Sequence, residues 1–95
     1  MISAVKYDEL PQSDVLKIYP NPASGYSVIA TFPLALKKKS VLNVTDVLGR
    51  EYYKKEILAN TLRTEIPISS LPAGIYYVLV SSEDGMMSQK LEVVR

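Results

Sequence analysis

The stretch Leu71-Pro72-Ala73-Gly74-Ile75-Tyr76-Tyr77-Val78 decides the predicted fold of this chain. Immunoglobulin-like sandwiches place a tyrosine near the start of their sixth strand, where its hydroxyl binds the backbone of the preceding corner. Tyr76 stands two residues before Val78, at the spacing that separates this tyrosine from a cysteine in antibody domains. Gly74 would let the backbone bend tightly just before it. We therefore expect Tyr76 and Val78 to face the core and Tyr77 to face outward.

On both sides of this stretch, the sequence alternates short runs of β-branched and aromatic residues with Pro, Gly, Asn or Ser at intervals of about 8 to 12 residues. No helical period is sustained. The predicted strands are residues 15–19, 26–32, 41–47, 51–58, 62–68, 75–82 and 87–94. Seven short antiparallel strands predict an all-β fold, an immunoglobulin-like β-sandwich, and leave the strand order open.

Turn residues set the predicted connections between these strands. Gly49 can take the positive φ that a tight hairpin between residues 41–47 and 51–58 needs. Asp84-Gly85 is a strong turn pair for the last hairpin. Pro67 lacks a backbone donor, so it marks residues 62–68 as an edge strand.

Length and composition exclude several classes of protein. Ninety-five residues make one small domain. A formal net charge of +1 with 22% charged residues argues against a nucleic-acid-binding face, which concentrates basic residues. Cysteine is absent, which excludes disulfides and zinc sites with thiolate ligands.

The residues of common catalytic and cofactor sites are also missing. Histidine is absent and the sequence contains no Gly-x-Ser-x-Gly elbow, so a nucleophile with an imidazole base cannot be assembled. The ten acidic residues do not follow the spacing of a calcium loop, and the four glycines lie far apart rather than in a phosphate-binding loop. We expect no enzymatic activity, no cofactor and no metal site.

The two ends of the sequence lead to expectations about domain organisation. Residues 1–14 have mixed polarity, no sustained period and a proline at Pro11, which suits a flexible linker from an upstream domain, with the folded domain at residues 15–95. Residues 1–25 lack the basic start and apolar run of a signal peptide. We expect an excised piece of a larger precursor that ends at Arg95 and carries its export signal elsewhere.

Four segments in this order resemble the C-terminal sorting domain (type A) of cargo proteins of the type IX (Por) secretion system of Bacteroidetes-type bacteria. They are Ile18-Tyr19-Pro20-Asn21-Pro22-Ala23, Asp46-Val47-Leu48-Gly49-Arg50, residues 71–78, and Lys90-Leu91-Glu92-Val93-Val94-Arg95. The resemblance covers about residues 15–95.

This resemblance implies a non-catalytic secretion signal. A precursor would reach the periplasm through a separate N-terminal signal, and the domain would direct it through the outer-membrane translocon to the outer-membrane surface or the extracellular space. A sortase-type peptidase would then remove the domain, with release or surface attachment of the cargo. Cleavage requires accessible backbone, and residues 3–13 are the candidate region. The implied recognition residues are Tyr19, Pro20, Asn21, Pro22, Gly49, Gly74, Tyr76, Lys90, Val93 and Val94.

Each motif also has a purely structural interpretation. The segment Pro20-Asn21-Pro22 serves either as a rigid crossover or as a rigid recognition ridge. Residues 90–95 form either an ordinary protected edge strand or an exposed edge that a partner reads by strand addition. Both interpretations stay open at this point.

A second function class fits the same fold, because fold alone does not determine function. This alternative is a non-catalytic fibronectin-like or carbohydrate-binding module appended to a secreted enzyme. Seven tyrosines without tryptophan raise the question of a sugar-stacking face. Tyr52 and Tyr53 are adjacent in one predicted strand and should therefore face opposite sides, so at most one of them joins a flat platform.

Overall fold

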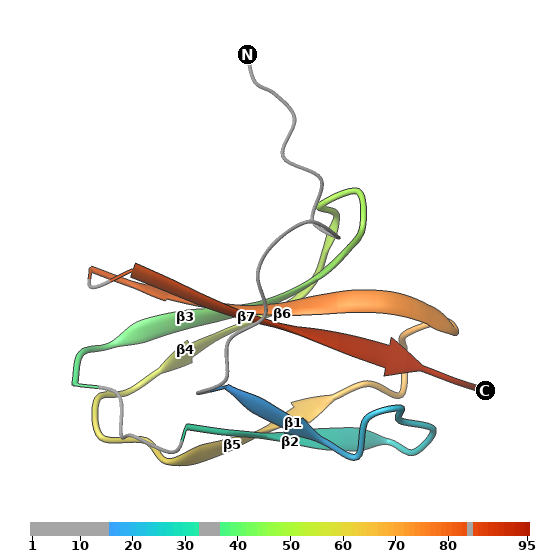
Figure 1. Cartoon of the computed structure of the whole chain (residues 1–95), viewed down its shortest axis with the longest axis horizontal. Helices are drawn as coiled ribbons and strands as arrows, with labels where there is room; N and C mark the ends of the chain where they lie inside the picture. Colours follow the sequence, from blue (N-terminus) through green and yellow to red (C-terminus); the bar gives the residue numbers. More distant parts are fainter. Residues whose placement is uncertain (1–15, 33–36, 84) are drawn as a thin grey trace.

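The computed structural model describes residues 16–32, 37–83 and 85–95, and these residues form two antiparallel β-sheets without a helix. Figure 1 shows the two layers, with β1, β2 and β5 in the lower one. The strands are β1 (Lys17–Tyr19), β2 (Ser27–Thr31), β3 (Ser40–Asp46), β4 (Glu51–Ile57), β5 (Arg63–Pro67), β6 (Gly74–Ser82) and β7 (Gly85–Val93).

The strand order is β1-β2-β5 in one sheet and β4-β3-β6-β7 in the other. The predicted all-β class and immunoglobulin-like sandwich are confirmed, and each of the seven predicted strands overlaps an observed one. Among the described strands, β5 with Pro67 pairs with β2 alone, so the predicted edge position is also confirmed. The predicted linker, residues 1–14, lies outside the described residues.

The core forms between the sheets from residues that alternate along the strands, as period-2 patterning requires. The inner sheet faces contribute Ile18, Val28, Ala30, Leu42, Val44, Ile57, Ile66, Tyr76, Val78, Val80, Leu91 and Val93. Phe32, Leu16, Ile68 and Leu71 extend this cluster from the loops and strand ends. Burying each larger aliphatic side chain contributes about 1.5 to 3 kcal/mol to folding.

Tyr77 is predicted to face outward, and it lies outside the core cluster between the sheets. Its side chain is nevertheless buried, with only 3% exposed. Tyr77 pairs with Thr45 on β3 and Lys90 on β7. The alternation of a strand specifies the face on which a side chain lies, but it does not specify whether that face is covered.

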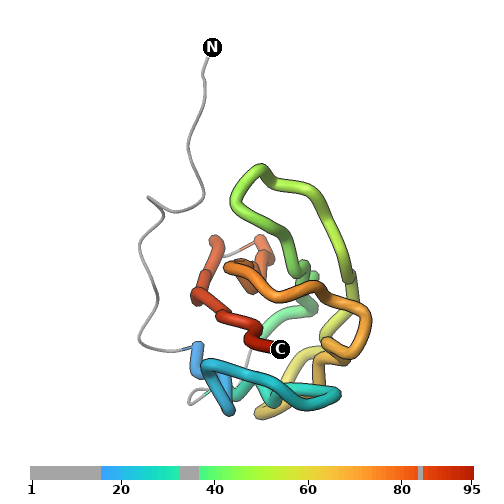
Figure 2. Tube along the Cα trace, turned by 90° about the vertical axis from the view of Figure 1, so that its right-hand side faces the viewer, coloured from blue at the N-terminus to red at the C-terminus, as the bar shows by residue number. Residues whose placement is uncertain are grey.

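The last strand lies next to the first described residues and the connection between β1 and β2. Figure 2 shows the C-terminal end beside the connection between β1 and β2. Ala23 in this connection forms a parallel bridge with Val93 of β7, and Gln89 Nε2 donates a 2.9 Å hydrogen bond to Leu16 O. These contacts link one side edge of the sandwich across its two sheets. No helix capable of crossing a bilayer occurs in the described part of the chain.

Candidate recognition site

The hairpin turn between β3 and β4 is organised by one carboxylate, that of Asp46. Its Oδ1 accepts hydrogen bonds from Leu48 N–H at 2.9 Å and Arg50 N–H at 3.0 Å. Its Oδ2 accepts one from Arg50 Nε at 2.6 Å and one from the Tyr52 hydroxyl at 3.1 Å. Gly49 has φ of 85°, which confirms the predicted positive φ in this turn. Asp46 therefore fixes both the backbone of the turn and the Arg50 side chain.

A β-bulge follows this turn on β4. Val44 pairs with Tyr53 and Thr45 with Glu51, so Tyr52 is the extra residue. Tyr53 packs against the core, and the Tyr52 ring meets the Tyr76 ring edge-on, with centroids 5.4 Å apart. Both rings thus contact core residues, and the expectation that they face opposite sides is wrong because the bulge interrupts the alternation.

Tyr76 makes the predicted corner bond. Its hydroxyl donates a 2.6 Å hydrogen bond to Pro72 O, four residues upstream. Gly74 has a positive φ of 158°, a backbone conformation that L side chains rarely adopt, so another residue there would strain the corner. Space is not the constraint, because a methyl group built there would lie 3.9 Å from a Tyr76 ring carbon, an ordinary contact. The corner is thus shaped by the conformation of Gly74 and held by the tyrosine hydroxyl.

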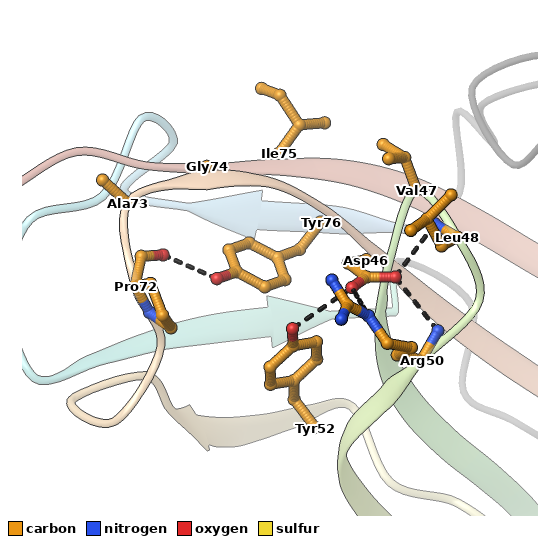
Figure 3. A pocket seen from close by; sticks show the side chains of 10 residues that line it. All are labelled: Asp46, Val47, Leu48, Arg50, Tyr52, Pro72, Ala73, Gly74, Ile75 and Tyr76. Carbon is orange, nitrogen blue, oxygen red and sulfur yellow. Dashed lines mark hydrogen bonds and ion pairs between the residues drawn. The ribbon is translucent and has the colours of Figure 1, made fainter.

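Turn and corner enclose a shallow pocket of about 320 Å³. Figure 3 shows the Asp46, Arg50 and Tyr52 groups on one side and the Pro72 to Tyr76 corner on the other. The lining residues are Asp46, Val47, Leu48, Arg50, Tyr52, Pro72, Ala73, Gly74, Ile75 and Tyr76. Val47 and Leu48 are exposed apolar side chains at the rim. Two of the four segments selected from the sequence are therefore parts of one surface.

The carboxylate of Asp46 is held in its charged form. Its burial favours the neutral form and by itself would raise the pKa. The hydrogen bonds from Arg50, Leu48 and Tyr52 together outweigh burial, so the pKa of Asp46 lies below its usual value of 3.8. The pKa of Tyr76 is raised, first by burial and then by the neighbouring Tyr52 and Asp46. The site thus contains a stable anion and a neutral phenol at physiological pH.

This pKa shift predicts how stability depends on pH. A carboxylate whose pKa is lower in the folded than in the unfolded state stabilises the fold above the unfolded pKa of about 3.8, and this contribution disappears as the pH falls through the folded pKa. We expect Asp46→Asn to be less stable at neutral pH and to lose less stability on acidification, as measured by thermal midpoints from neutral pH to below the folded pKa. Glu56→Gln, an exposed carboxylate on β4, controls for the lost charge. Parallel acid profiles for the wild type and Asp46→Asn would contradict this role.

The other two segments also meet. Asn21 Nδ2 donates a 2.7 Å hydrogen bond to Lys90 O, and Asn21 Oδ1 accepts one of 3.0 Å from Glu92 N–H. Ala23 N–H donates to Glu92 O at 2.8 Å, and Ala23 O accepts from Val94 N–H at 2.8 Å. The segment from Pro20 to Ala23, in which both prolyl peptide bonds are cis, therefore lies along the edge of β7.

Arg95 joins this edge to the tyrosine corner. Its Nε and Nη2 donate to Leu71 O at 3.3 and 3.0 Å, and Nη2 also donates to Ile68 O. Its Nη1 donates to Ser24 O at 3.3 Å and Gly25 O at 3.1 Å. One guanidinium thus ties the β1–β2 connection to the segment that leads into β6, and all four selected segments occupy one end of the sandwich.

The implied recognition residues separate into exposed and supporting groups. The exposed ones are Tyr19, Pro20, Asn21, Pro22, Gly74, Lys90 and Val94. Gly49 is half-buried in its turn, and Tyr76 and Val93 are buried in the core. β7 is an edge strand, as expected, but its outer edge from Lys90 to Val94 is occupied by residues 21–23. Of the two interpretations left open for residues 90–95, the structure therefore supports the protected edge and not the exposed one.

Two organising residues of the site lie in the four segments but were not among the implied recognition residues, namely Asp46 as the turn acceptor and Arg95 as the link between segments. Aspartate side chains in turns commonly accept a hydrogen bond from the backbone N–H two residues further on. The sequence Asp46-Val47-Leu48-Gly49 therefore contained a local signal for the role of Asp46 in this turn. Arg95 gives no local signal, because its partners are 24 to 71 residues away along the chain.

Fold and site together define a class of protein, namely immunoglobulin-like β-sandwiches in which four sequence motifs meet on one surface at one end. Within the described residues, no group of three or more acidic, His or Cys side chains is placed to hold a metal ion. The family model for the secretion system C-terminal sorting domain matches residues 17–94, and the chain belongs to this family. No curated protein matches the chain.

Membership in this family establishes the function of the domain. It is a C-terminal sorting signal for type IX secretion, which implies interaction with the type IX secretion machinery. It also implies export to the outer-membrane surface or the extracellular space. Domains of this kind are generally not catalytic. The alternative of a fibronectin-like or carbohydrate-binding module is not favoured.

Proposed function

We propose that the outer-membrane translocon of the type IX system recognises the end of the sandwich at which the four segments meet. The observation that supports this is their convergence: the Asp46 turn and the Tyr76 corner share one pocket, and Arg95 links the corner to the segment that covers β7. The exposed residues Tyr19, Pro20, Asn21, Pro22, Gly74, Lys90 and Val94 contact the partner. Gly49, Tyr76 and Val93 hold the shape of the surface.

The proposal extends to the route and fate of the cargo. Residues 15–95 act as the sorting domain and residues 1–14 as a linker to an upstream cargo. The precursor passes through the periplasm, and after translocation a sortase-type peptidase cuts within residues 3–13. The domain itself catalyses no reaction. Mass mapping of processed termini tests the cut, because termini within the strands would contradict it.

A reporter experiment tests the proposed function. The reporter carries a cleavable N-terminal export signal and residues 1–95 at its C-terminus, and it is expressed in a type IX-competent strain and in a translocon-deficient derivative. We expect delivery to the surface or medium only in the competent strain. Retention of a folded reporter in the periplasm of both strains would contradict the proposal.

Lys90→Ala locates the recognised surface within the same assay. The Lys90 side chain is exposed on β7 and only its backbone carbonyl binds Asn21, so the substitution should leave the melting temperature nearly unchanged. Lys54→Ala on β4, at the opposite edge of the sheet, is the matched control. If Lys90→Ala alone reduces export, Lys90 belongs to the surface that the translocon contacts. Normal export of this variant would show that the Lys90 side chain is not part of that surface.

A further inference from the structure

The outer edge of β7 has an internal partner for every backbone group from Lys90 N–H to Val94 N–H. Lys90 N–H donates to Gln89 Oε1 at 3.2 Å. The Asn21 side chain binds the next two groups, since Lys90 O accepts from Asn21 Nδ2 and Glu92 N–H donates to Asn21 Oδ1. The Ala23 backbone binds the last two, since Glu92 O accepts from Ala23 N–H and Val94 N–H donates to Ala23 O. On its other side β7 is fully paired with β6. This edge is therefore closed by elements of the same chain.

Two consecutive groups of this edge are closed by one side chain, that of Asn21. The carboxamide of Asn21 presents an N–H and a carbonyl to Lys90 O and Glu92 N–H, which is what a peptide group of a neighbouring strand would present. Asn21 itself is exposed, whereas Ala23 is fully buried and holds the following two groups. Removing the Asn21 amide would thus uncover two consecutive edge groups and remove two of the four hydrogen bonds that hold residues 21–23 on this edge.

If the outer edge of β7 were uncovered, its charge pattern would suit pairing with β7 of a second copy of this chain. Leu91 and Val93 face the core, so Lys90 and Glu92 lie on the outer face. If residues 21–23 left this edge and two β7 edges paired antiparallel about Leu91, Lys90 of each copy would stand opposite Glu92 of the other. This register forms two cross-strand pairs of opposite charge, related by a two-fold axis.

We propose that Asn21 keeps the domain monomeric by anchoring residues 21–23 on the β7 edge, which closes this edge against strand addition from a second copy of this chain. Exposed strand edges are general templates for pairing between chains, and short covering segments prevent it. The role follows from contacts within the domain and is independent of the proposed recognition by the translocon.

The test compares Asn21→Ala with Asn43→Ala in the full 95-residue chain. Asn43 is a matched control because its Nδ2 also donates one short hydrogen bond, 2.6 Å to Glu51 Oε1, but from the inner strand β3. Analytical ultracentrifugation over a range of protein concentration measures mass, and hydrogen exchange measures the Glu92 amide. We expect Asn21→Ala to approach twice the monomer mass at high concentration, with Glu92 exchanging rapidly when dilute and slowly when concentrated. The wild type and Asn43→Ala stay monomeric.

A charge change tests the register. Adding Glu92→Lys to Asn21→Ala places lysines opposite each other, so the double variant should return to a monomer. If Asn21→Ala does not fold, Asn21→Asp replaces it, because its carboxylate still accepts from Glu92 N–H but cannot donate to Lys90 O. A folded variant that stays monomeric at all concentrations would overturn the proposal. Association that leaves Glu92 unprotected, or that persists in the double variant, would overturn it as well.

Discussion

Tyr76→Ala should lower the free energy of unfolding by about 3 to 5 kcal/mol, the cost typical of truncating a buried aromatic side chain. The Tyr76 ring is buried in the core, packs edge-on against Tyr52 and anchors the corner through Pro72 O. A small domain has a total stability of about 5 to 15 kcal/mol, so a large fraction of the molecules should unfold at moderate temperature. Denaturant unfolding monitored by circular dichroism measures the change.

Two further tyrosine variants show which part of Tyr76 matters. Tyr76→Phe keeps the ring and loses only the bond to Pro72 O, so we expect a smaller loss of about 1 to 3 kcal/mol. Tyr26→Ala is the control, because this side chain is 84% exposed and should leave stability nearly unchanged. If Tyr76→Ala were as mild as Tyr26→Ala, the corner would not be a determinant of the fold.

Arg95→Ala should lower the free energy of unfolding by about 2 to 3 kcal/mol, because charged donors form hydrogen bonds stronger than neutral ones. The guanidinium binds the carbonyl groups of Ser24, Gly25, Ile68 and Leu71. Losing it releases the β1–β2 connection from the segment before β6, and hydrogen exchange in both loops should rise together. Thermal unfolding and hydrogen exchange measure the two effects.

Arg95→Lys distinguishes geometry from charge. A lysine ammonium keeps the positive charge but lacks the planar fork that spans several carbonyls, so it should restore only part of the stability. Arg63→Ala, an exposed arginine on β5, is the control for the loss of one positive charge. Full restoration of stability by lysine would show that the positive charge, rather than the several hydrogen bonds of the guanidinium, accounts for the effect.

The fold was predictable because strand alternation and turn chemistry are local properties. Period-2 patterning located all seven strands, and Pro67 identified β5 as an edge from its missing donor alone. The Tyr76 corner was predictable because it closes over only four residues. The burial of Tyr77 and the bulge at Tyr52 were not predictable from the sequence. Both depend on neighbouring segments of the fold, which the residue pattern of a single strand does not encode.

The site was predictable as a set of segments but not as a surface. The motifs around Asn21 and Lys90 were both selected, yet nothing local indicates that an asparagine would occupy a strand edge 69 residues further along the chain. Arg95 likewise acts on carbonyl groups whose positions are set only after the two sheets pack. Long-range side-chain to backbone bonds leave no period in the sequence, which is why the sequence could not decide between a protected and an exposed β7 edge.

The contacts of Asn21 with Lys90 and of Gln89 with Leu16, which span 69 and 73 residues, have a consequence for synthesis. Contacts of such high sequence separation form only when both partners exist and the intervening chain is ordered. A polypeptide whose translation stops before β7 therefore lacks the covering of β7 and the Arg95 link, however well its preceding parts fold. The assembled end of the sandwich therefore exists only in molecules that contain β7 and Arg95 as well as the β1–β2 connection.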